Sequence, residues 1–179
     1  MSVQSTIGAV RNRGSCGSGG FTLVEMMITI VVAGVLLAFG IPAFNDAVLG
    51  SKVSAVANDL YASIQLARSE AIKRNVPITL CPSTDAAACD DSGDWEVGWI
   101  VLNPATSEVL QVQEAAPEHF KVVQSGGTAD LSFQPVGLGA TAAVFTVCRA
   151  SPVGAQERQI DVTGTGVAYV TMTENGSCP

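Results

Sequence analysis

Residues 21–44 read FTLVEMMITIVVAGVLLAFGIPAF, and Glu25 is the one charged residue among these 24. At a rise of about 1.5 Å per residue, a helix of this length spans roughly 36 Å, which is enough to cross a bilayer. The stretch therefore predicts a single membrane-spanning helix close to the N-terminus.

The preceding segment, residues 1–20, is polar, carries Arg11 and Arg13 and ends in Gly19-Gly20. Basic flanks stay on the cytoplasmic side of a membrane, so the residues after the helix are expected to be exported. A secretory signal is cut after its apolar part at a small-residue site, but residues 38–42 read AFGIP and offer no such site. Cleavage at the glycine pair, before the helix, would keep the helix in the mature protein.

The motif Gly20-Phe21-Thr22-Leu23-Val24-Glu25 resembles the prepilin processing site of type IV pilins and type II secretion pseudopilins. The resemblance implies that a prepilin peptidase cuts after Gly20, removes residues 1–20 as a leader and methylates the new N-terminal Phe21. It extends to Pro42, the position at which many pilins carry a helix-bending proline. It also implies a fold, a long N-terminal helix followed by a β-rich head.

Glu25 has two interpretations. The spacing Thr22-x-x-Glu25 matches a capping box, in which the two residues satisfy free backbone amides at a helix start. A carboxylate inside a lipid-spanning segment, however, costs roughly 2.5 to 3.5 kcal/mol and usually marks a function. The pilin resemblance implies that Glu25 pairs with the N-terminal ammonium of a neighbouring subunit and so sets the stagger of a filament.

After Pro42 an apolar stripe continues with the period of an amphipathic helix, at Leu49, Val53, Val56, Leu60, Ile64, Ala67 and Ala71. The helix is expected to end near Asn75, with the cations Lys73 and Arg74 in its last turn. Phe21 to Arg74 would then be one helix of roughly 80 Å, bent at Pro42. We divide the chain into a leader (1–20), a membrane half of the helix (21–44), an amphipathic half (45–75) and a periplasmic head (76–179).

Beyond Asn75 the pattern alternates with period two, and Gly, Pro, Asp and Ser separate the runs. About eight strands are expected, at residues 78–81, 97–102, 109–112, 120–123, 131–134, 143–149, 158–162 and 167–172. An antiparallel β-sheet domain packed on the amphipathic half of the helix gives an α+β fold. Residues 67–75 (ARSEAIKRN), 80–83 (LCPS) and 93–99 (GDWEVGW) are similar to the FimT/FimU type of minor pilin, which is related to pseudopilin H of type II secretion.

Five cysteines are present, but Cys16 lies in the leader, which leaves an even set in the exported part of the chain. Of three possible connectivities we favour Cys81 with Cys89, which closes a short loop, and Cys148 with Cys178, which holds the C-terminus. A zinc site is the alternative, although no two cysteines show a C-x2-C spacing.

Other polar groups offer little chemistry. His119, the one histidine, is interpreted as a surface residue, and residues 137–142 (GLGATA) as a glycine-rich turn. The acidic loop with Asp85, Asp90, Asp91 and Asp94 could hold calcium, but it lacks the spacing of an EF-hand loop. We expect no enzymatic activity, no cofactor and no metal.

The chain has 9 basic and 16 acidic residues and a net charge of -7, which disfavours binding to phosphate backbones. Some FimT-type pilins are credited with DNA binding through a Gly-Arg-x-Arg motif, but the corresponding place here reads Gly166-Val167-Ala168-Tyr169. The resemblance therefore implies a minor pilin that assembles in a type IV pilus from the bacterial inner membrane. Its partners would be the prepilin peptidase, other minor and major pilins and the assembly platform. A type II secretion pseudopilin and a DNA-binding pilin for competence are the alternatives.

Overall fold

The structure is a computed structural model that describes residues 20–90, 93–126, 129–136, 139–152, 156–173 and 178, apart from the side chains of residues 42 and 43. The chain divides into two units, Met1–Ile41 and Pro42–Pro179, and each is considered by itself. The elements of the described residues are α1 (Leu23–Arg74), β1 (Ile78–Pro82), the 3-10 helix η1 (Trp95–Val97), β2 (Trp99–Asn103), β3 (Glu108–Gln113), β4 (Phe120–Ser125), β5 (Leu131–Phe133), β6 (Ala143–Arg149), β7 (Glu157–Val162) and β8 (Ala168–Thr173).

The end of α1 follows from local sequence. Lys73 and Arg74 stand in its last turn, where cations complement the helix dipole. Asn75 has φ 54° and so adopts the left-handed conformation that terminates helices, two residues before Pro77. Arg74 also joins the helix end to the head, since its guanidinium lies 2.6 Å from Glu70 and 2.7 Å from Glu108 on β3. The predicted end of the helix near Asn75 is confirmed.

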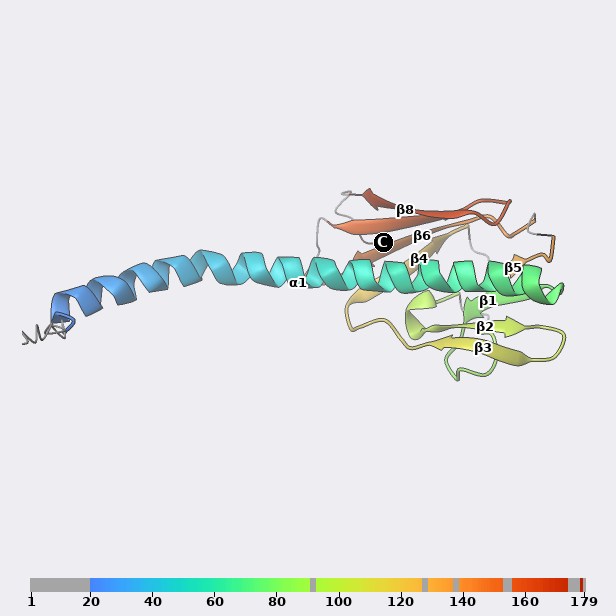
Figure 1. Cartoon of the computed structure of the whole chain (residues 1–179), viewed down its shortest axis with the longest axis horizontal. Helices are drawn as coiled ribbons and strands as arrows, with labels where there is room; N and C mark the ends of the chain where they lie inside the picture. The colour runs from blue at the N-terminus through green and yellow to red at the C-terminus, as the bar shows by residue number, and fades with distance from the viewer. Residues whose placement is uncertain are drawn as a thin grey trace, which may run out of the picture. The chain divides into compact units, whose positions relative to one another are not determined.

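The strands form two antiparallel sheets of four, in the orders β3-β2-β1-β5 and β4-β6-β7-β8 among the described residues. Within the unit Pro42–Pro179, the second half of α1 runs beside strands of both sheets (Figure 1). The predicted α+β class, a long helix packed on antiparallel sheets, is confirmed.

One continuous core joins the helix to both sheets. The predicted stripe of α1 is buried in it from Val53 to Ala71, and Leu49 is partly buried at its edge. The aromatic rings of Trp95 and Phe145 meet edge to face with centroids 4.8 Å apart, which ties η1 to the second sheet. The largest fully buried apolar side chains of the described chain are Trp95, Trp99, Phe133, Phe145, Leu60, Ile64, Ile78, Leu80, Ile100, Leu131 and Ile160.

The start of β2 differs from the prediction. Val97 was expected to open the strand, but it ends η1, and β2 begins at Trp99. Gly98 separates the two elements with φ 106°, and a Cβ at this position would lie 2.6 Å from the carbonyl oxygen of Gln113. The backbone thus needs glycine here. The other strand boundaries agree with the prediction to within two residues, and both ends of β6 agree without a shift.

Candidate functional site

The first unit of the chain is an exposed apolar helix. Its large apolar side chains from Phe21 to Ile41 are between 51% and 76% exposed. By length and composition α1 is able to cross a membrane, and none of its most apolar window is buried. Such a surface needs lipid or the helices of other subunits around it.

The helix starts with a reciprocal cap at Thr22. The hydroxyl oxygen of Thr22 accepts a hydrogen bond from the Glu25 N–H at 3.1 Å, and the Glu25 carboxylate accepts one from the Thr22 N–H at 3.4 Å. This is the capping box that the Thr22-x-x-Glu25 spacing allows. Glu25 is nevertheless exposed, so the cap leaves open its predicted pairing with a neighbouring ammonium.

Gly20 and Phe21 lie just outside the helix, which begins at Leu23, and both are exposed. The predicted cleavage and methylation at this peptide bond stay predictions, and residues 1–19 of the leader, with Cys16, lie outside the described residues. Pro42 stands within α1 at the start of the second unit. Its side chain is not among those described, and the predicted bend stays a prediction.

The head contains two disulfides, Cys81–Cys89 and Cys148–Cys178, each with a Cα–Cα distance of 5.5 Å. The first joins β1 to the loop that follows it, and the second joins β6 to the end of the chain. Sulfur atoms bonded in this way are no longer thiolates, which are the zinc ligands that the alternative interpretation requires. No group of three or more His, Cys, Asp or Glu side chains that could hold a metal occurs in the described part of the chain.

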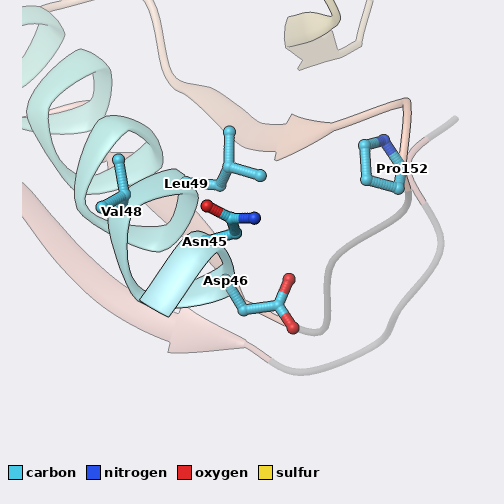
Figure 2. A pocket seen from close by; sticks show the side chains of 5 residues that line it. All are labelled: Asn45, Asp46, Val48, Leu49 and Pro152. Atoms are coloured by element: carbon cyan, nitrogen blue, oxygen red, sulfur yellow. The ribbon is translucent and has the colours of Figure 1, made fainter. Parts of the chain in front are cut away.

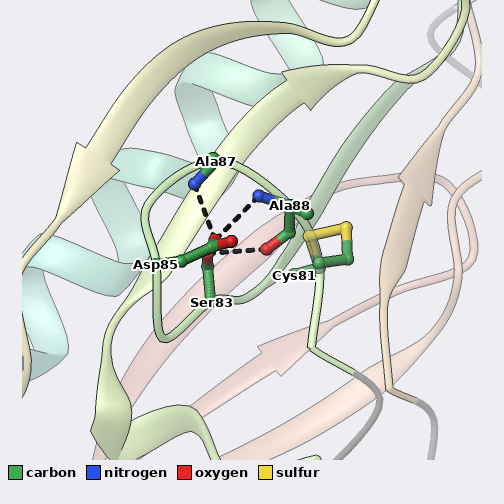
Figure 3. The surroundings of a disulfide bond; sticks show 6 residues. Cys81, Ser83, Asp85, Ala87 and Ala88 are labelled. Atoms are coloured by element: carbon green, nitrogen blue, oxygen red, sulfur yellow. Dashed lines mark hydrogen bonds between the residues drawn. A yellow bond between two sulfur atoms is a disulfide. The ribbon is translucent and has the colours of Figure 1, made fainter.

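Hydrogen bonds between Asp85 and nearby backbone N–H groups fix the conformation of the acidic loop (Figure 3). One carboxylate oxygen of Asp85 accepts hydrogen bonds from the N–H groups of Ala87 at 2.9 Å and Ala88 at 3.0 Å. The Ser83 hydroxyl lies 3.1 Å from the same oxygen and donates to the Ala88 carbonyl at 2.6 Å. The Ala88 and Ala87 amides and the Ser83 hydroxyl hold the pKa of Asp85 below its ordinary value. Asp85 therefore shapes this loop, and Asp91 lies outside the described residues.

His119 and the glycine-rich segment at residues 137–142 are not part of any named helix or strand. His119 is exposed with φ 70° immediately before β4, and its carbonyl accepts a hydrogen bond from the Ala150 N–H at 2.8 Å. Gly137 and Leu138 lie outside the described residues, while Gly139 has φ 93° and Ala140 bridges to Phe133. His119 thus lies in a turn, whereas the turn predicted at residues 137–142 falls partly outside the described residues and stays a prediction.

A shallow pocket lies where α1 enters the head, lined by Asn45, Asp46, Val48, Leu49 and Pro152 (Figure 2). Beside it Arg149, whose side chain is 6% exposed, reaches Asp46 with a distance of 3.5 Å between Nη2 and Oδ1. Sequence patterns did not reveal this buried cation, because an arginine at the end of a strand normally reaches solvent. The pair fastens this end of the sheet β4-β6-β7-β8 to the helix.

Comparison with known proteins places the chain in a family. Residues 56–166, more than half of the chain, match the family model of the type II transport protein GspH. The chain belongs to this family. Residues 16–41 match the prokaryotic N-terminal methylation motif. The two matches together assign the chain as a pilin-like structural subunit with an N-terminal methylation motif.

Solved relatives share the fold. The minor pilin FimU of Pseudomonas aeruginosa superposes with a TM-score of 0.54 at 19% identity, covering 66% of this chain and 91% of FimU. The minor pseudopilin EpsH of the Vibrio cholerae type 2 secretion system gives a TM-score of 0.52 at 12% identity, covering 68% of this chain and 97% of EpsH.

Curated relatives match a short stretch of the chain. The type IV major fimbrial protein FimA of Dichelobacter nodosus is 51% identical over 35 residues, which are 20% of this chain. The match spans 22% of the length of that protein. The match thus covers about a fifth of either chain.

Proposed function

We propose that this chain is a minor pilin, a non-enzymatic subunit of a type IV pilus. The observation that carries the proposal is the exposed apolar half of α1, which has a single carboxylate and is joined to a folded head of the GspH family. Residues 21–44 anchor the precursor in the bacterial inner membrane with the head in the periplasm. The same helix then packs among the helices of other pilins in the filament.

Maturation follows from the motif at the helix start. A prepilin peptidase removes residues 1–20 by cutting after Gly20 and methylates Phe21. The N-terminal methylation motif over residues 16–41 supports this step, as does the exposed, non-helical position of Gly20 and Phe21. Mass spectrometry of membrane-extracted protein should show a chain that begins at Phe21 with one added methyl group. An N-terminus beyond Pro42 would contradict the proposal.

Glu25 serves assembly in this proposal. Its carboxylate pairs with the N-terminal ammonium of a neighbouring subunit, because a charge surrounded by apolar helices needs a partner of opposite sign. The other partners are sister minor pilins, the major pilin and the inner-membrane assembly platform. A pull-down with residues 45–179 should retain sister minor pilins, and retention of none would contradict the role of the head in the contact.

A type II secretion pseudopilin is the second candidate, and the GspH family match favours it. The 35-residue identity with a type IV fimbrial protein and the two disulfides of the head favour the pilus. Deletion of the gene separates the two. Loss of surface pili with normal protein secretion supports the minor pilin, whereas normal pili with failed secretion supports the pseudopilin.

A further inference from the structure

We propose that Thr22 is a positioning residue for leader removal, because its cap ends the helix before the peptide bond that is cut. The inference rests on the proposed cleavage after Gly20. It assigns Thr22 a task that is separate from the assembly role of Glu25.

Three hydrogen bonds define the start of the helix. The Thr22 hydroxyl oxygen accepts from the Glu25 N–H at 3.1 Å, and the Thr22 carbonyl accepts from the Met26 N–H at 3.1 Å. The Glu25 carboxylate adds a longer contact of 3.4 Å to the Thr22 N–H. Thr22 is thus the cap residue, with its carbonyl inside the helical ladder and its side chain closing the end.

The position of this cap decides what happens to the Gly20 carbonyl, where a peptidase attacks. In an α-helix each N–H bonds the carbonyl four residues earlier. If α1 began two residues sooner, the Val24 N–H would bond the Gly20 carbonyl and draw it into the helix. With the cap at Thr22, the Gly20–Phe21 bond stays exposed and outside the helix.

Next to an apolar environment, the helix needs a cap to begin at Thr22 and not earlier. Backbone N–H groups that are removed from water are strongly stabilised by the hydrogen bonds of a helix. A helix next to lipid therefore tends to extend until another acceptor satisfies its first N–H groups. The Thr22 hydroxyl does so for the amide of residue 25. Without it, helical and open forms of the cleavage site compete, and the open fraction falls.

The roles of Thr22 and Glu25 can be separated because the 3.1 Å bond ends on the backbone of residue 25. Glu25→Ala keeps that N–H and loses only the longer contact of the carboxylate. Thr22→Val removes the hydroxyl and keeps the size and branching of the side chain. We therefore expect Thr22→Val to slow cleavage and Glu25→Ala to leave it close to normal.

The test measures initial cleavage of the full-length membrane-extracted precursor by prepilin peptidase. Thr22→Val should be cut more slowly, by up to about fivefold, the largest factor that a cap loss of about 1 kcal/mol gives. Thr22→Ser and Thr22→Asn should both be cut within twofold of the normal rate, because serine and asparagine cap as well as threonine. Thr29→Val is the matched control, since the Thr29 hydroxyl donates to the Met26 carbonyl at 2.9 Å and caps nothing.

Each outcome has a distinct meaning. Normal cleavage of Thr22→Val overturns the inference, and so does slow cleavage of Thr22→Asn, which would mean that the peptidase reads the threonine side chain itself. An unaltered precursor that is not cut after Gly20 overturns the proposed maturation instead.

Discussion

The indole N–H of Trp99 donates a 2.9 Å hydrogen bond to the hydroxyl of Ser63, which lies 36 residues earlier on α1. The Ser63 hydroxyl in turn donates to the Asp59 carbonyl at 2.9 Å. Ser63 is completely buried and Trp99 is 2% exposed, so this chain of hydrogen bonds links helix and sheet inside the core. Removal of one partner from a buried hydrogen bond leaves the other partner unsatisfied, which lowers the free energy of unfolding.

We expect Ser63→Ala to lower the free energy of unfolding of the head by about 1–3 kcal/mol, because the indole N–H loses its acceptor. Urea unfolding of residues 45–179 measures the change. Ser69→Ala is the control, since Ser69 is exposed and its hydroxyl donates only to the Leu66 carbonyl. An equal loss in both variants would contradict the role of the Trp99–Ser63 bond.

The two disulfides should contribute unequally. They close loops with sequence separations of 8 for Cys81–Cys89 and 30 for Cys148–Cys178. Because loop entropy in the unfolded chain grows with length, Cys178→Ser should cost at least about 2 kcal/mol, roughly 1 kcal/mol more than Cys89→Ser. Unfolding of each variant tests the order, and non-reducing peptide mapping tests the pairing. Free thiols in the protein isolated from cells would contradict this pairing.

The Asp85 loop should depend on pH. Hydrogen bonds hold the pKa of Asp85 below its ordinary value of about 4, so the ionised carboxylate stabilises the fold above that pH. This contribution is lost as the pH falls through the lowered pKa of the folded state. Asp85→Asn should thus be less stable than the unaltered head at neutral pH, and the difference should shrink below about pH 4. Asp130→Asn, at an exposed aspartate, is the control.

Glu25→Ala should insert in the membrane at least as well as the unaltered chain, because removal of a carboxylate lowers the cost of the span by roughly 2.5–3.5 kcal/mol. It should also be cleaved and yet be missing from filaments. Sheared pilus fractions are compared with the membrane pool, with Thr29→Ala as a control in the same helix. If Glu25 serves only the cap, the variant loses about 0.5–2 kcal/mol at the helix start and enters filaments normally.

Sequence periodicity predicted where the helix and strands lie, but not which strands pair or every residue that is buried. The stripe from Val53 to Ala71 is buried because its apolar residues recur with the helical period. Ala57 and Ser63 are equally buried but escaped prediction, since alanine occurs on any face and serine usually lies on the surface. The division into two sheets was not predictable either, because the pairing of β1 with β5 and of β4 with β6 joins segments distant in sequence.

In the candidate site, too, some features follow from local sequence and others only from the tertiary fold. The motif at Gly20, Phe21 and Glu25 predicts a processing site through local residue order, whereas the ion pair between Arg149 and Asp46 depends on the tertiary fold. The requirement for glycine at position 98 also depends on the tertiary fold. It arises from the Gln113 carbonyl, which β3 brings close, and alternation alone placed Val97 in the strand.

The apolar half of α1 has a consequence for how the proposed pilin would pass from the membrane into a filament. Hydrocarbon tails and the aliphatic side chains of neighbouring helices are about equally apolar, so moving this helix between them changes its free energy little. In the proposed pilus, transfer of this helix from the bilayer to the filament therefore costs little free energy in either direction. Entry into the proposed filament and return to the membrane can then be one reversible step, whose direction depends on small polar contacts.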